Sequence, residues 1–594
     1  MSKNSASEPS GVPPGDNTKE KPQEAPDTVD VEQQNSSPII QDENVSGTNK
    51  IEAIQAVWGK HGKLLVILAL CFSMIAFEFD NSTIYTYFVY AQSHFDQIAA
   101  LAAVKTAGGL CFAVLKPLVA KLSDVFGRGE MYPVWMLFYI LAAVLSAKSP
   151  NYESYAAGYM LHMFAQTGVN TMNDILAADV TTARQRGFAV QLQFLPYVFM
   201  PFTSAFVTEK VVNGIGWRWG IGMLGIILPI GLAPIIFLLL NWQRKAKKAG
   251  WINTNNKMTP YRFFSELDMG GMTLFSGGLA LILLPATLAG TLPNGWRTSW
   301  VIACVVIGSA CLIALPFYER FFAKHPFMPT RYLKDLNITM ALLLYATDGI
   351  ALGVTHSYFY TWCIISRGYS VRDAVFITAT SRAVQFLCGI ILGGILWWTR
   401  RYKWLIFGGV AIRFVGYGLM FRIRDSSSTT AEIIIVQVIQ GIGDALVGTC
   451  SFVASTVAVP HKEVAQMTSL AVCLSTLGST IGTAIGGGIY TNYFRAELVK
   501  ELGPYATPSL IGTVFNSITK SLPPMGSPER VAIGRAYDRI MAYFTYVAFG
   551  SIVPGIIFGW YLPDRKLTDT HNLVEDQEQT SEIDDKAVMN SNHR

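Results

Sequence analysis

The chain has 594 residues, of which 51% are hydrophobic and 15% charged, and its formal net charge at pH 7 is +5. That much apolar sequence exceeds what a single soluble core can bury, so the lipid bilayer is the expected solvent. A small soluble enzyme is excluded, and a nucleic-acid partner is not expected.

The two ends of the chain differ in kind from the rest. Residues 1–59 and 565–594 are rich in Ser, Asn, Gln, Glu, Asp and Pro and lack periodic apolar positions. Such segments cannot bury enough apolar surface to fold, so we expect two disordered tails. The N-terminus shows no cleavable signal-peptide pattern, and the first apolar segment is expected to direct insertion.

Between the tails, mostly apolar runs recur, and about 14 of them reach the roughly 20 residues that a membrane-spanning helix needs. We therefore expect an all-α integral membrane protein with about 14 spans. The spans are centred near residues 75, 108, 140, 165, 198, 230, 280, 309, 350, 386, 412, 444, 478 and 551.

Basic residues predict the orientation, because Lys and Arg collect in cytoplasmic loops. Clusters follow the second, fourth, sixth, tenth and last spans, and a further one precedes the first. An even number of spans with both tails in the cytoplasm fits all of them. The bias is imperfect, since Arg530, Arg535 and Arg539 fall in a loop expected outside.

Polar residues inside the spans carry the functional prediction, because ionisable groups at that depth are costly and usually face a cavity or a partner. In the fourth span they recur at intervals of three or four, which places them on one helix face. The predicted cavity residues are His162, Gln166, Asn170, Asn173, Asp174, Tyr345, Asp348, Arg382, Gln385, Gln440 and Asp444. The alternative is that these residues pair with one another as interhelical locks.

Other patterns limit the chemistry. There is no CxxC, no HExxH and no close His pair, so we expect neither a resident metal nor a cofactor, and iron would move already chelated. No phosphate-binding GxxxxGK[ST] loop is present, so ATP is not expected to power the protein. Gly478, Gly482 and Gly486 recur every four residues, a pattern that predicts close helix packing.

The loop after the second span resembles the cytoplasmic signature of the major facilitator superfamily. It runs from Lys116-Pro117 through Ala120-Lys121-Leu122 to Asp124, Gly127 and Arg128, with Ala120 in place of the first glycine and Gly129 in place of a basic residue. This variant is similar to that of the fungal siderophore-iron transporters, the 14-helix proton symporters of the superfamily. Further similar segments are Asp80-Asn81, the run 217–223, Gln440 to Gly443, and Gly526 to Arg530.

The resemblance implies a domain layout. It gives an N-terminal six-helix bundle over 60–243, a cytoplasmic linker and two additional helices over 244–336, and a C-terminal six-helix bundle over 337–564. It also implies that a long extracellular loop, 494–537, captures the substrate and gates the cavity through Tyr505, Phe515 and Tyr537. An inert connector is the alternative for that loop.

The resemblance further implies a proton-coupled importer of ferric siderophores, with ferrichrome-type hydroxamates as the expected cargo. Asp80 is the first candidate for the coupling group and Glu78 the second; a fixed salt bridge from Asp80 to Lys105 or Arg382 is the alternative. Asp444 stands where the family more often has a small residue. Haem import, drug or metabolite export, and a non-transporting receptor remain open. The plasma membrane is the expected location, with endosomes second.

Overall fold

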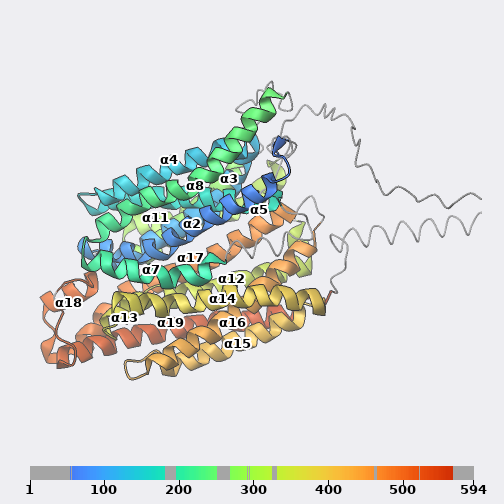
Figure 1. The fold of residues 1–594 in the computed structure, drawn as a ribbon. Helices are drawn as coiled ribbons and strands as arrows, with labels where there is room; N and C mark the ends of the chain where they lie inside the picture. Colours follow the sequence, from blue (N-terminus) through green and yellow to red (C-terminus); the bar gives the residue numbers. More distant parts are fainter. Residues whose placement is uncertain are drawn as a thin grey trace, which may run out of the picture. The chain divides into compact units, whose positions relative to one another are not determined.

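In the computed structural model of this chain, the described residues are 54, 57–180, 195–249, 268–289, 292, 294–323, 331–459, 464–520 and 522–565. They form helices joined by short turns (Figure 1). In the N-terminal part the helices are α2 (Gly62–His94), α3 (Leu101–Phe126), α4 (Arg128–Ala147), α5 (Tyr152–Val180), α7 (Pro196–Asn213) and α8 (Trp217–Lys248).

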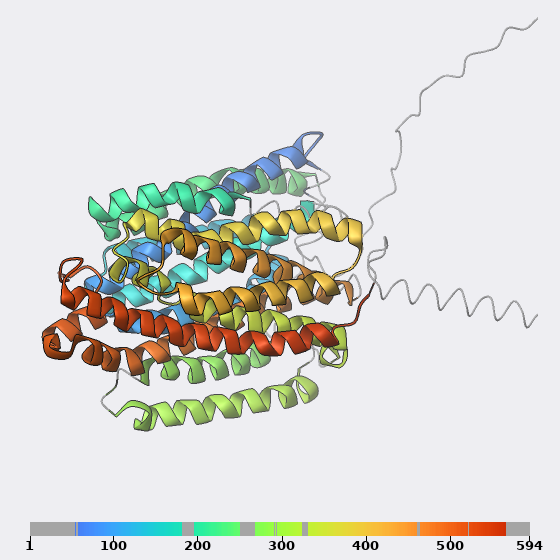
Figure 2. The ribbon, with the colours of Figure 1, turned by 90° about the horizontal axis from the view of Figure 1, so that it is seen from below.

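Two helices follow at the positions expected for the additional pair, α10 (Met269–Leu288) and α11 (Ser299–Phe321). Figure 2 shows α11 on the outer edge of the helices, beside α10. The C-terminal part contains α12 (Leu336–His356), α13 (Phe359–Ile365), α14 (Val371–Thr399), α15 (Lys403–Ile423), α16 (Thr430–Val457), α17 (Val464–Leu502), α18 (Pro508–Asn516) and α19 (Pro528–Tyr561).

Twelve helices in the described ranges are long and apolar enough to cross a membrane. The predicted count of 14 is therefore not confirmed. The two remaining long helices, α5 and α7, are not among the twelve, and α5 carries the polar stripe that lowers its hydropathy. Both pack among the others, α5 against α3 and α4, and α7 against α2 and α14. That α5 and α7 also cross the bilayer stays a prediction.

The helices pack as two sets. In the first, α8 packs against α2 and α4, and α5 packs against α3 and α4. In the second, α12 contacts α16, α17 and α19, while α15 contacts α16 and α19. The two sets meet where α3 contacts α17 and α7 contacts α14, and α10 contacts both α3 and α17.

Close approach of α12 and α17 confirms the packing prediction for the glycine repeat. A Cβ added at Gly478 would overlap the carbonyl oxygen of Ala346, and one at Gly482 would overlap that of Ile350. Only glycine lets these two backbones come so near, because any side chain would push them apart. The repeat therefore positions α12, which carries two of the predicted site residues, Tyr345 and Asp348.

Candidate functional site

Asp80 lies at the centre of a buried polar cluster formed by α2, α4 and α5. Its side chain is 1% exposed, and its Oδ2 accepts a hydrogen bond from the hydroxyl of Tyr139 and another from Nε2 of Gln166 at 3.3 Å. His162 Nε2 lies 3.3 Å from the same oxygen and forms an ion pair with it when the ring is protonated. Asp80 Oδ1 has no hydrogen-bond partner in the described part of the chain.

Helical spacing explains how two of these groups meet. His162 and Gln166 are four residues apart on α5, so their side chains lie on one face, as predicted. Tyr139 of α4 was not among the predicted site residues. Its ring packs edge-on against that of His162, with 4.7 Å between the ring centroids. Tyr132 and Tyr139 are seven residues apart, two helical turns, and this spacing was the available signal.

The fixed salt bridge weighed for Asp80 is absent from the described residues. Lys105 places its Nζ 4.4 Å from the ring centroid of Tyr85, and the ion pair that Asp80 forms is the one with His162. Glu78, the second candidate, is also buried and accepts a hydrogen bond from Nδ2 of Asn81 at 3.2 Å. Among the described residues, Asp80 therefore has no Lys or Arg at ion-pair distance.

The rest of the α5 stripe has different partners. Asn173 is fully buried, and its Oδ1 accepts hydrogen bonds from Tyr132 at 2.9 Å and Ser73 at 3.3 Å. Asp174 lies 3.5 Å from Nζ of Lys116 on α3. Asn170, which lies between Gln166 and Asn173 in the sequence, is also buried. Asn173 and Asp174 thus contact neighbouring helices of the first set through Tyr132, Ser73 and Lys116.

A second buried cluster locks three helices of the second set together. Arg413 of α15 is 1% exposed and donates from Nε to Asp348 Oδ1 of α12 at 2.6 Å. Its NH1 group donates to Oε1 of Gln440 on α16 at 3.0 Å. Gly443 makes room for this guanidinium, because a Cβ there would lie 2.7 Å from Arg413 Cγ. Asp348 and Gln440 are therefore engaged by a permanent cation, unlike Asp80.

Arg382, Gln385 and Asp444 gather between α14 and α16. A Cβ added at Gly448 would lie 4.0 Å from Gln385 Nε2 and 4.0 Å from Asp444 Oδ1. The Arg382 side chain is exposed and lies within electrostatic range of Asp444, of Tyr197 on α7 and of Glu78 on α2. Its charge therefore has neighbours on three other helices. Tyr345 of α12 lies near Asp444 as well.

The three aromatic residues predicted for the gate do not come together. Phe515 and Tyr537 are buried in a stack with Tyr490 and Phe494, in which Tyr490 donates a hydrogen bond to the carbonyl of Phe515 at 3.1 Å. Tyr505 stands apart and is 47% exposed. The connection is also shorter than predicted, since α17 continues to Leu502 and α19 begins at Pro528.

Ser93, near the end of α2, makes several hydrogen bonds to this connection. Ser93 Oγ lies 2.8 Å from Ser517 Oγ and 2.8 Å from Thr519 Oγ1, and it accepts hydrogen bonds from the backbone N–H groups of Ile518 and Thr519 at 2.9 and 3.0 Å. Beside it, Lys520 Nζ lies 2.6 Å from Asp96 Oδ2. Ser93 thus joins the first set of helices to the segment between α18 and α19.

Replacing Ser93 by Ala should release this segment, because alanine removes only the hydroxyl group, which bonds the backbone amides of both Ile518 and Thr519. We expect amide hydrogen exchange at 517–520 to accelerate by roughly an order of magnitude, the equivalent of about 1.4 kcal/mol. Ser509→Ala, at an exposed site on α18, is the matched control. Unchanged exchange in Ser93→Ala would show that Ser93 does not hold the segment.

The signature loop joins α3 and α4 through Gly127, whose φ of 107° favours glycine. Arg128 follows it and is buried, donating from Nε to Asp179 Oδ2 at 3.1 Å and from NH1 to Ser123 Oγ at 3.2 Å. Arg128 therefore ties the start of α4 to the end of α5. The side chain of Asp124 lies outside the described residues. Among the described residues, no group of three His, Cys, Asp or Glu could hold a metal ion.

Known proteins with similar sequences cover most of this chain. Residues 89–565 match the family model described as the fungal trichothecene efflux pump (TRI12). The chain is 30% identical over 542 residues to the MFS siderochrome iron transporter C of Aspergillus fumigatus, covering 89% of this chain and 88% of that protein. It is 27% identical to the low affinity heme transporter str3 of Schizosaccharomyces pombe, covering 91% and 89% of the two chains.

The fold is that of solved transporters. A crystal structure of the peptide transporter POT in complex with sulfate superposes with a TM-score of 0.51, at 15% sequence identity, over 85% of this chain and 98% of that one. The chain is therefore an integral membrane protein of the major facilitator superfamily, and it belongs to the family of the fungal siderophore iron transporters.

Proposed function

We propose that this protein is a proton-coupled secondary transporter that imports ferric siderophore chelates, with ferrichrome-type hydroxamates as the first cargo to test. The relative from Aspergillus fumigatus is named a siderochrome iron transporter, and it matches nearly the whole chain. Secondary transporters of this superfamily bind cargo near the bilayer midplane and expose it to each side in turn. The names of the relatives support a transport role, and our proposal adds the identity of the cargo and the coupling to protons.

The observation that carries the proton coupling is the setting of Asp80. Its carboxyl group is buried, accepts hydrogen bonds from Tyr139 and Gln166, and lies 3.3 Å from His162 Nε2, without a Lys or Arg at ion-pair distance among the described residues. A carboxyl group in such a place can gain and lose a proton without breaking a permanent ion pair. Asp348 cannot do so as readily, because Arg413 lies 2.6 Å from it. We therefore assign the coupling role to Asp80 and keep Glu78 second.

For the cargo we propose the space around Arg382, between the two sets of helices. Arg382 and Gln385 on α14, Asp444 on α16 and Tyr345 on α12 would present charge, amide and aromatic groups to a chelate. Their mutual proximity supports this assignment. His162 and Gln166 contact Asp80, so in this proposal they connect cargo and proton sites rather than contact the cargo alone.

Haem is the second candidate cargo, because one relative is named a low affinity heme transporter. Export is the third possibility, because the matching family model is described as an efflux pump. Competition among radioiron-labelled ferrichrome, ferrioxamine and haem in one assay on expressing cells separates these cases. Inhibition of ferrichrome uptake by unlabelled ferrichrome alone supports the proposal. Preferential haem uptake, net efflux or binding without uptake would each replace it.

The location proposed is the plasma membrane, with both termini in the cytoplasm. Asn35 and Asn44 stand in N-x-S sequons of the N-terminal tail, which lies outside the described residues. Because glycans are added only on the lumenal side, neither asparagine should carry one. The measurement is the electrophoretic mass before and after glycosidase. A glycosidase-sensitive shift that Asn35→Gln or Asn44→Gln removes would invert the proposed orientation.

Of the three predicted gate residues, Tyr505 is the one that we propose contacts the chelate. Because this side chain is exposed and outside the Phe515–Tyr537 stack, Tyr505→Ala should leave the fold intact. We expect the half-saturating chelate concentration to rise about tenfold if the ring contributes a stacking contact worth about 1.4 kcal/mol. Phe515→Ala and Tyr537→Ala should instead lower surface expression, because both side chains are buried. Unchanged uptake kinetics in Tyr505→Ala would favour the inert connector.

A further inference from the structure

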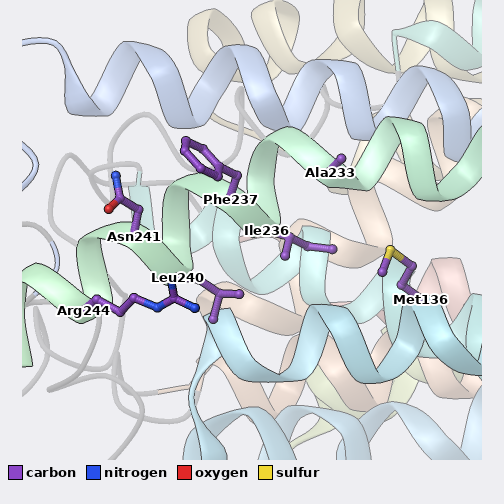
Figure 3. Close-up of a pocket in the computed structure, with 7 residues that line it drawn as sticks. All are labelled: Met136, Ala233, Ile236, Phe237, Leu240, Asn241 and Arg244. Carbon is purple, nitrogen blue, oxygen red and sulfur yellow. The ribbon is translucent and has the colours of Figure 1, made fainter.

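A hollow of about 300 Å³ lies on the side of the protein where α8 runs beside α4 (Figure 3). It is lined by Met136, Ala233, Ile236, Phe237, Leu240, Asn241 and Arg244. Six of these seven residues come from α8 at intervals of one, three or four positions, so they share one helix face. This place is separate from the Asp80 cluster and from Arg382.

Local sequence explains why α8 is hollowed here. Ala233 contributes only a methyl group, and Pro234 follows it inside the helix. Proline lacks an N–H, so the carbonyl of Ile230 loses its partner within the helix at this level. Further along, α4 and α8 are joined again, where Gln243 Nε2 donates to Glu130 Oε1 at 3.0 Å.

The hollow is apolar along its length and positively charged at one end. Phe237 is 68% exposed, and Figure 3 shows the Arg244 side chain extending beside α8 toward Leu240. Lys245, Lys247 and Lys248 follow Arg244 and are also exposed. None of these four cations forms an ion pair within the described ranges of the chain. Glu130 is the acidic neighbour, and it is bound by Gln243.

The dimensions fit one leaflet of a membrane. From Ala233 to Arg244 a helix rises roughly 16 Å, about half of the roughly 30 Å hydrocarbon thickness. An apolar groove of that length ending in unpaired cations complements a lipid acyl chain ending in a phosphate. We propose that the hollow between α4 and α8 binds a glycerophospholipid with an anionic headgroup, its chain against Ala233, Ile236 and Leu240 and its phosphate on Arg244 and Asn241.

Native mass spectrometry of the purified protein tests this site independently of transport. Detergent-solubilised protein is titrated with phosphatidylglycerol or with phosphatidylcholine of the same acyl chains. Wild-type protein should bind phosphatidylglycerol at least several-fold more tightly. Arg244→Gln should lower that affinity roughly fivefold, the effect expected of one basic residue at a lipid headgroup. Ala233→Trp should abolish binding at this site, because the indole fills the hollow.

Two matched variants make the result specific. Lys247→Gln removes an exposed cation that does not line the hollow, and Ile230→Trp places an indole on an exposed position of the same helix outside it. Both should bind phosphatidylglycerol like the wild type. Equal affinity for the two lipids would overturn the proposal. It would also be overturned if Lys247→Gln weakened binding as much as Arg244→Gln, or if Ala233→Trp had no effect. Melting temperatures of all four variants report whether each is folded.

Discussion

Replacing Asp80 by Asn is expected to abolish accumulation of the chelate against its gradient and to remove the pH dependence of uptake. The amide keeps the size of the carboxyl group and can still bond to Tyr139 and Gln166, but it cannot carry a proton. An inward proton gains about 2.3 kcal/mol at 100 mV and about 1.4 kcal/mol for each pH unit. Those gains could support an accumulation of roughly a few hundredfold, which Asp80→Asn should reduce to equilibration.

The measurement is initial uptake and steady-state accumulation of radioiron chelate at several external pH values. Exchange of labelled for unlabelled chelate should survive in Asp80→Asn, because cargo binding does not need the proton in this account. Glu78→Gln is the matched variant, a neighbouring buried carboxylate on the same helix. If Asp80→Asn accumulates chelate like the wild type while Glu78→Gln does not, the coupling group is Glu78.

Replacing Arg413 by Leu is expected to destabilise the protein by roughly 3–5 kcal/mol, the cost of leaving a buried charge without its partner. Asp348 would remain in the contact region of α12, α15 and α16 without the guanidinium that lies 2.6 Å from it. The measurement is the unfolding of purified protein in detergent, followed by loss of helical signal during denaturant titration.

The double variant Asp348→Leu with Arg413→Leu separates the charge from the packing. Removing both charges leaves apolar groups in an apolar place, so most of the lost stability should return. Wild-type stability of the single variant would contradict the lock. A double variant no more stable than the single one would show that the shape of Arg413, rather than its charge, holds the helices.

Helical spacing predicted that His162 and Gln166 share a face of α5, but it did not predict that this face contacts Asp80. It could not predict Tyr139, since a tyrosine in an apolar helix is usually a packing residue and its partner depends on how α4 lies against α2. Helical spacing also could not show which residues of the α5 stripe contact Asp80 and which contact other groups. Asn173 bonds to Tyr132 and Ser73, a contact that only the packing of three helices decides.

The end of α17 shows the difference between a membrane boundary and a helix boundary. Hydropathy falls near Phe494, which set the predicted start of the loop, but the helix continues to Leu502. Its polar extension is held by charged contacts, Lys500 to Glu497 at 3.7 Å and Arg535 of α19 to Glu501 at 3.1 Å. Apolar runs mark the part of a helix that crosses lipid, and side-chain pairs extend helices beyond it.

In α5 the hydropathy is low although a membrane span was predicted there. Its polar residues face other helices, so they lower the mean hydropathy without facing lipid. Asp348 and Gln440 were assigned to a cavity because they are polar residues inside predicted spans. Nothing in the spacing indicated that Arg413 of α15 bonds to both.

Uptake by purified protein in proteoliposomes tests the central proposal most directly. With radioiron ferrichrome outside and an imposed inward proton gradient, the account predicts accumulation inside that collapses when a protonophore is added. Asp80→Asn vesicles should only equilibrate the chelate. Accumulation that is unaffected by the protonophore, or export of preloaded chelate driven by the same gradient, would contradict proton-coupled import.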